Sequence, residues 1–138
     1  MIPVCLITAT YIKDIDRFKL LRQSINKYAH NYHHITVVHD EDIKEFKKQF
    51  PNEKNFTLLS TADILPKDVE RRREKLYDRK IPLDLKRRIY HPYISGWHCQ
   101  QLTKIATLAA CDYEAAAFLD SDLFLCQPLD DAFFGVKG

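Results

Sequence analysis

The stretch HITVVHDEDIKEFKKQFPNEKNFTLLS, residues 34–60, decides the fold because it contains a complete strand–helix–strand unit. HITVVHD, with its β-branched residues Ile35 to Val38, predicts a buried strand that ends at His39-Asp40. Ile43, Phe46 and Phe50 then recur at helical spacing, and Pro51 ends the helix. A second buried strand follows at residues 56–60. Two strands joined by a helix predict parallel pairing.

The same alternation continues on both sides of this unit. VCLIT, residues 4–8, predicts a first buried strand. Residues 14–28 predict a helix with an apolar face and an N-terminal Asp14 or Asp16 cap, the face being formed by Phe18, Leu21, Ile25 and Tyr28. AAAFL, residues 115–119, predicts a fourth strand. Residues 95–111 predict the helix before it, with a buried stripe of Leu102, Ile105, Ala106 and Ala109.

Strand and helix alternate throughout, so we expect an α/β fold with a three-layer, Rossmann-like parallel sheet. Right-handed crossovers favour the strand order 3-2-1-4. That order reverses direction between strands 1 and 4, and open α/β sheets bind ligands beyond the carboxyl ends of their strands at such a reversal. Residues 1–138 form one domain, in which residues 62–95 are an irregular or helical excursion containing the helical LPKDVERRREKLY.

Composition excludes several classes of protein. The 138 residues carry 21 basic and 19 acidic side chains, a net charge of +2, which does not favour a nucleic-acid binder. No segment is long enough for a membrane span or typical of a signal peptide. The four scattered cysteines indicate a reducing, cytoplasmic location, with Cys5 and Cys126 as small buried hydrophobes. The basic stretch Lys67–Arg88 is either a solvated face or a phosphate-binding patch.

The fourth strand ends in Asp120-Ser121-Asp122. Residues two apart on a strand point the same way, so the two carboxylates converge if the extended conformation persists. Magnesium uses one or two carboxylates together with substrate phosphates, and manganese suits the same oxygen ligands. We therefore expect Asp120 and Asp122 to bind Mn²⁺ or Mg²⁺. The alternative is an Asp-rich turn closed by side-chain hydrogen bonds.

A family resemblance enters with these residues. FLDSDLFLCQPL resembles the Asp-x-Asp segment of nucleotide-sugar-dependent glycosyltransferases of the GT-A fold. SGWHCQQLTKIATLAACDYEAAAFLDSD resembles one glycosyltransferase-like group with Gly-Trp, a Gln pair, a Lys and then the Asp-x-Asp strand. ITATYIKDIDRFKLLRQSI resembles the opening of the same group. The resemblance implies the N-terminal half of a GT-A fold and a nucleotide-sugar donor, in particular a UDP-sugar, with the acceptor unknown.

The resemblance also implies residue roles. Asp122 would be the main metal ligand, and Asp120 would contact the ribose or the metal. The other residues that would contact the nucleotide are Thr10, Tyr11, Asp40 and Lys104, and Lys104 would contact a phosphate. Each has a structural alternative. Tyr11 would pack over the sheet edge, Asp40 would cap the next helix, and Lys104 would be a surface lysine. Gln100 and Gln101 would only satisfy backbone groups, and Trp97 would be an anchor packed beneath a loop.

The family's catalytic domains continue beyond the point that corresponds to Gly138. We therefore expect residues 1–138 to be the nucleotide-binding part of a glycosyltransferase, truncated at its C-terminus, which binds a nucleotide diphosphate weakly and transfers no sugar alone. The alternative is a non-catalytic nucleotide- or partner-binding module derived from such a fold. A phosphatase is disfavoured because its Asp-x-Asp usually follows the first strand. A nucleotidyltransferase lacks support because the sequence has no Gly-rich phosphate loop.

Overall fold

The computed structural model describes residues 3–51, 53–78, 80–82, 84–85 and 96–135. Four strands form one parallel sheet in the order β3-β2-β1-β4, which confirms the predicted α/β class and strand order. The elements are β1 (Val4–Thr10), η1 (Ile12–Asp14), α1 (Ile15–Tyr28), β2 (His33–Val38), η2 (Asp40–Asp42), α2 (Ile43–Gln49), β3 (Phe56–Ser60), α3 (Thr61–Ile64), α4 (Lys67–Tyr77), α6 (Gly96–Ala110), β4 (Ala115–Phe118) and η3 (Asp131–Phe134).

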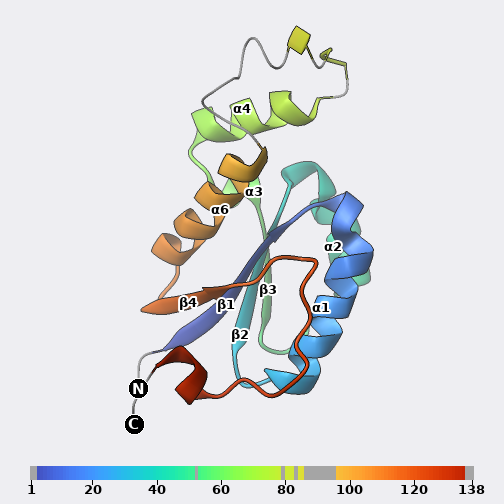
Figure 1. The fold of residues 1–138 in the computed structure, drawn as a ribbon. Coiled ribbons are helices and arrows are strands. Elements are labelled where there is room, and N and C mark those ends of the chain that lie inside the picture. The colour runs from blue at the N-terminus through green and yellow to red at the C-terminus, as the bar shows by residue number, and fades with distance from the viewer. Residues whose placement is uncertain (1–2, 52, 79, 83, 86–95, 136–138) are drawn as a thin grey trace.

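Helices cover both faces of the sheet, with α1 and α2 on one side and α6 on the other (Figure 1). The larger core lies beneath α1 and α2 and includes Leu6, Phe18 and Phe46, all fully buried. The second core joins Cys5 and Ile7 to side chains at the end of α6. Alternate residues of β1 therefore face opposite helical layers, which explains why this strand is apolar without interruption.

The carboxyl ends of the strands lie at different heights. β1 pairs with β2 as far as Thr10, two residues beyond the predicted end of the strand. β4 pairs with β1 only as far as Phe118, which lies beside Ile7. The Leu119 N–H then donates to the Ile7 carbonyl at 2.9 Å. The chain leaving β4 at Asp120 therefore lies beside the last residues of β1.

The helix α1 packs as its spacing predicts, since Phe18, Leu21 and Ile25 are buried against the sheet. Asp14 occupies the N-cap position, yet its side chain makes no capping hydrogen bond. The chain after β4 runs along this helix: the Leu125 N–H donates to the Ser24 hydroxyl at 2.9 Å, and the Leu129 N–H donates to the Tyr28 carbonyl at 2.9 Å.

The predicted buried stripe of α6 is wrong. Leu102 is 44% exposed and Ile105 is 60% exposed, Ala109 is exposed, and Ala106 is half-buried. The buried residues are instead Cys99, Thr103, Lys104 and Thr107. Thr103 and Thr107 donate their hydroxyls to carbonyls one turn earlier, at 2.7 and 2.6 Å. Satisfied in this way, hydroxyls pack against a sheet with little desolvation cost.

The helical part of the excursion at residues 62–95 is confirmed as α4, which lies over the carboxyl end of the sheet (Figure 1). Residues 86–95 of the predicted excursion lie outside the described part of the chain. Cys5 is buried as predicted, whereas Cys126 is exposed, so the prediction for Cys126 is wrong. Among the described residues, no helix is both long and apolar enough to cross a membrane.

Candidate functional site

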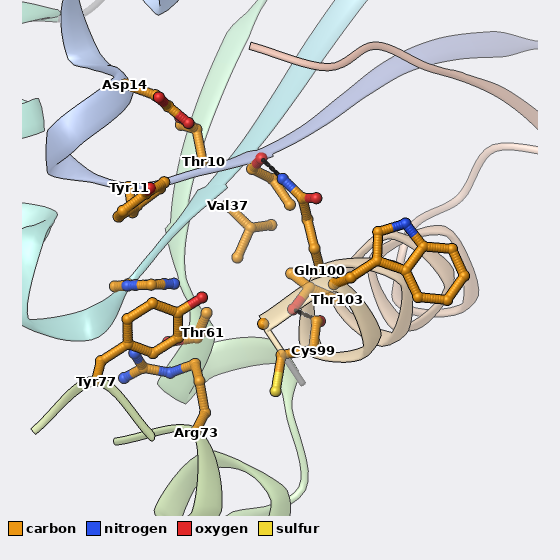
Figure 2. A pocket seen from close by; sticks show the side chains of 14 residues that line it. Thr10, Tyr11, Asp14, Val37, Thr61, Arg73, Tyr77, Cys99, Gln100 and Thr103 are labelled. Atoms are coloured by element: carbon orange, nitrogen blue, oxygen red, sulfur yellow. Dashed lines mark hydrogen bonds between the residues drawn. The ribbon is translucent and has the colours of Figure 1, made fainter. Parts of the chain in front are cut away.

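A pocket of about 370 Å³ lies at the carboxyl edge of the sheet, on the side covered by α6 (Figure 2). Its floor comes from the ends of β1 and β2, while α4 and α6 form opposite walls. It lies over β1 and β2, next to the predicted reversal of strand order. The lining residues are Ala9, Thr10, Tyr11, Asp14, Val37, His39, Thr61, Arg73, Tyr77, Gly96, Trp97, Cys99, Gln100 and Thr103.

Three rings pack together at one end of this pocket. His39 lies between Tyr11 and Tyr77, with centroid distances of 5.4 and 4.4 Å, and the two tyrosine rings are 6.1 Å apart. Burial, together with the charge of Arg73, lowers the pKa of His39 to about 4. The imidazole is therefore neutral at physiological pH and offers one donor and one acceptor.

The wall formed by α4 is held in place by a buried arginine. Arg73 is fully buried and makes a bidentate pair with Glu41, at 3.1 and 2.8 Å, and two further bonds to Glu70, at 2.9 and 2.7 Å. The Thr61 hydroxyl donates to Glu70 at 2.8 Å. Arg73 is thus neither part of a solvated face nor available to a phosphate. Its neighbours Arg71 and Arg72 are exposed.

Gly96 leaves room for the Tyr77 side chain where α6 lies near α4. A Cβ atom at this position would lie 2.7 Å from the Tyr77 hydroxyl oxygen, closer than such contacts allow. Across the pocket, the Gln100 side-chain amide donates to the Ala9 carbonyl at 3.2 Å, as its structural alternative predicts (Figure 2). Trp97 is 64% exposed at the pocket rim, so the prediction of an anchor packed beneath a loop is wrong.

The Asp-Ser-Asp segment forms a turn rather than a continuation of β4. The Leu123 N–H donates to the Asp120 carbonyl at 3.1 Å, so Ser121 and Asp122 are the central residues of the turn. The premise of a persisting extended conformation is therefore wrong. The Ser121 hydroxyl donates to Asp14 at 3.3 Å. Because Asp14 lines the pocket, this bond connects the turn to it.

Lys104 and Asp120 form an ion pair beneath the turn, with Nζ 2.5 Å from Oδ1. The lysine side chain is only 4% exposed, whereas that of Asp120 is 57% exposed. Lys104 is therefore not a surface lysine, and its partner in this structure is a carboxylate. Its contact with a phosphate stays a prediction.

The remaining predicted contacts occupy different environments. Thr10 lines the pocket and is 4% exposed, and its buried Oγ1 has no hydrogen-bond partner among the residues that the structure describes. Asp40 is exposed, and its backbone N–H donates to Thr61 at 3.2 Å. Its carboxylate is not part of the pocket lining, and no capping bond from it is found among the described residues. Asp42 instead reaches the Ile12 N–H at 2.9 Å.

Asp120 and Asp122 are the two carboxylates that the turn could offer to a hard cation. Within residues 3–135, apart from the gaps named above, no group of three or more His, Cys, Asp or Glu is arranged around one point. At most two carboxylates of the turn would therefore share an ion. This donor set fits Mg²⁺ or Mn²⁺ when phosphate oxygens and water complete the coordination.

Sequence reasoning missed His39, Arg73 and Tyr77. His39 directly follows β2, so the rule that selected Asp40 at a strand end also applied to it. The sequence carries no comparable signal for Arg73 or Tyr77, because both belong to a helix whose position over the sheet is set by tertiary contacts.

Comparison with known protein families gives a match over the whole chain. The model of a family of unknown function, DUF6492, matches residues 1–138. The chain belongs to this family. No curated protein and no solved structure matches the chain. The family description assigns no activity, so a functional proposal has to rest on the chemistry of the pocket and the turn.

Proposed function

We propose that this chain is the nucleotide-binding part of a glycosyltransferase that takes its sugar from a nucleotide diphosphate donor with a divalent cation. One observation carries the proposal: the aromatic pocket and the Asp-Ser-Asp turn are joined through the Ser121–Asp14 hydrogen bond. A nucleoside and its diphosphate need such a combination, with an aromatic surface for the base and a carboxylate-bound cation for the phosphates.

The nucleoside end of the ligand would contact the three rings. Tyr11 and Tyr77 offer aromatic faces, and neutral His39 can donate to one polar atom of a base and accept from another. Thr10 Oγ1, at the same floor, finds no hydrogen-bond partner in the described part of the chain, and the burial of such a polar atom is costly until a ligand or water satisfies it. These features support a polar, planar ligand over an apolar one.

The diphosphate end would lie at the turn. Asp122 is exposed, and Asp120 keeps one carboxylate oxygen outside its 2.5 Å contact with Lys104. The two carboxylates would hold Mg²⁺ or Mn²⁺, which neutralises a departing diphosphate. Lys104 fixes the rotamer of Asp120 and adds one positive charge directly beneath the site.

Calorimetry with UDP tests this function. We expect heat of binding with Mn²⁺ present, and at least a tenfold weaker affinity without it. Asp122→Ala should remove the manganese dependence, whereas Asp112→Ala should leave it intact, because Asp112 is also exposed but follows the C-terminal end of α6 rather than lying in the turn. Binding that is unchanged by Asp122→Ala would exclude the metal role of the turn.

The outer face of α4 favours a second candidate, a non-catalytic module that binds an acidic partner. Its exposed cations Lys67, Arg71, Arg72 and Lys75 form no ion pair with the described residues. If this face defines the function, UDP should give no heat, and capture of an acidic partner should weaken with salt and with Arg71→Glu/Arg72→Glu. Capture that is insensitive to both would exclude this candidate.

A further inference from the structure

Two free thiols lie together on the face of the sheet that α6 covers. Cys5 of β1 is fully buried in a cluster with Ile7 and Ile35. Cys111, the residue after α6, packs against the same cluster. The fold thus brings together two cysteines that are far apart in the sequence.

The two thiols differ in their access to solvent. Cys5 is 0% exposed, whereas Cys111 is half-buried. Each also contacts a backbone carbonyl: Cys5 Sγ lies 3.8 Å from the Ala115 oxygen, and Cys111 Sγ lies 3.3 Å from the Leu108 oxygen. A small oxidant in solution therefore reaches Cys111 first, and Cys5 is reached from Cys111.

We propose that Cys5 and Cys111 form an intramolecular disulfide when the chain meets a peroxide. In the first step the Cys111 thiol attacks hydrogen peroxide, giving a sulfenic acid and one water. In the second step the Cys5 sulfur attacks the Cys111 sulfur, the S–O bond breaks, and a second water leaves with the Cys5 proton. The two thiols lose two electrons in total, and the peroxide gains them.

The environment of Cys5 determines how this pair behaves. Burial, and secondarily the neighbouring Cys111, raises the pKa of Cys5 to about 12. The thiolate is the nucleophile, so disulfide closure is slow at neutral pH and faster as pH rises. The reduced pair also gains no stabilisation from a thiolate, so the disulfide, once formed, resists reduction by small thiols.

The disulfide would join the beginning of β1 to the end of α6. The residues of α6 that line the pocket, Gly96 to Thr103, belong to its other end. This inference is therefore independent of the proposed nucleotide site, and UDP binding is not its readout. Cys126 is exposed and provides an internal control for oxidant access.

Peptide mapping of the full chain tests the proposal. The chain is treated with hydrogen peroxide at pH 8, blocked with N-ethylmaleimide and digested without reductant. We expect a cross-linked peptide pair containing Cys5 and Cys111, which is absent in Cys111→Ser and retained in Cys126→Ser. In Cys5→Ala, dimedone should label Cys111. The oxidised wild-type chain should melt at least about 5 °C higher, because the bond closes a long loop.

Three results would overturn the proposal. One is an unmodified Cys111 under conditions that oxidise Cys126. Another is Cys111 oxidised to the sulfinic acid while Cys5, once unfolded, still reacts with maleimide. The third is a cross-link that joins a different pair of cysteines. The melting temperature of the wild-type chain requires no substitution, so the test remains decisive if a variant fails to fold.

Discussion

Replacing Arg73 with methionine tests whether α4 is held over the sheet by its buried charge network. Methionine keeps most of the side-chain volume and removes all the donors. Two carboxylates lose the arginine: that of Glu70, 9% exposed, which keeps its hydrogen bond from Thr61, and that of Glu41, 49% exposed. Only the buried carboxylate of Glu70 carries a large desolvation penalty, since half-exposed charges are solvated by water.

The expected loss follows from this asymmetry. Removing one partner of a buried pair costs about 3–5 kcal/mol in the free energy of unfolding. Because water solvates the half-exposed Glu41, we expect Arg73→Met to cost about 3 kcal/mol, the lower end of that range. With an m-value of about 2 kcal/mol/M in urea, the unfolding midpoint should fall by about 1.5 M. Urea denaturation followed by circular dichroism measures this change directly.

A double substitution separates the charge effect from the packing effect. Glu70→Gln in the Arg73→Met background removes the unpaired carboxylate, so it should recover at least about 1 kcal/mol. Arg71→Met is the matched control: its side chain is exposed on the same helix, and its stability should stay within about 0.5 kcal/mol of wild type. An Arg73→Met protein as stable as the Arg71→Met control would refute the reasoning.

Three further predictions concern other parts of the chain. Burial, and then the charges of Arg22 and His33, lower the pKa of His34 well below its usual value of 6.5. The stability that neutral His34 contributes is therefore complete above pH 6.5 and is lost as pH falls. The melting temperature should decrease from pH 7 to pH 5, and His34→Gln should make this decrease smaller. Gly96→Ala should displace the tyrosine that it contacts and weaken UDP binding at least fivefold by calorimetry, with little change in melting temperature. Ile105→Gln should change the free energy of unfolding by less than about 0.5 kcal/mol, because Ile105 is 60% exposed, and a loss above 1 kcal/mol would contradict the observed orientation of α6.

The strands were predictable because burial on both faces leaves a direct mark on the sequence. Residues 4–10 and 35–38 are apolar or β-branched, and helical spacing in α1 assigned Phe18, Leu21 and Ile25 to its buried face correctly. Topology then followed from the rules for parallel sheets. The same reasoning failed for α6, where the burial of Lys104 orients the helix and places Ile105 toward solvent. Hydropathy alone cannot indicate that a threonine is buried with its hydroxyl already satisfied.

The candidate site was predictable only where it belongs to a strand end. Thr10, Tyr11 and the Asp-Ser-Asp segment follow strands, so topology placed them at one edge of the sheet. The opposite wall depends on Arg73, whose partners Glu41 and Glu70 come from two separate elements. The pair with Glu70 is a local i,i+3 pair within α4, whereas the pair with Glu41, 32 positions away in η2, has no local sequence pattern.

Asp120 and Asp122 differ in how firmly their side chains are held in place, and this difference affects how each would bind a cation. Asp120 is fixed by a lysine that is 96% buried, since only 4% of the Lys104 side chain is exposed. Moving a buried ammonium group away from its carboxylate is costly, so Asp120 keeps this partner when a ligand binds. Asp122 lies in the turn and is exposed. A cation at the turn would therefore be captured first by Asp122, while Asp120 contributes one oxygen from a fixed position.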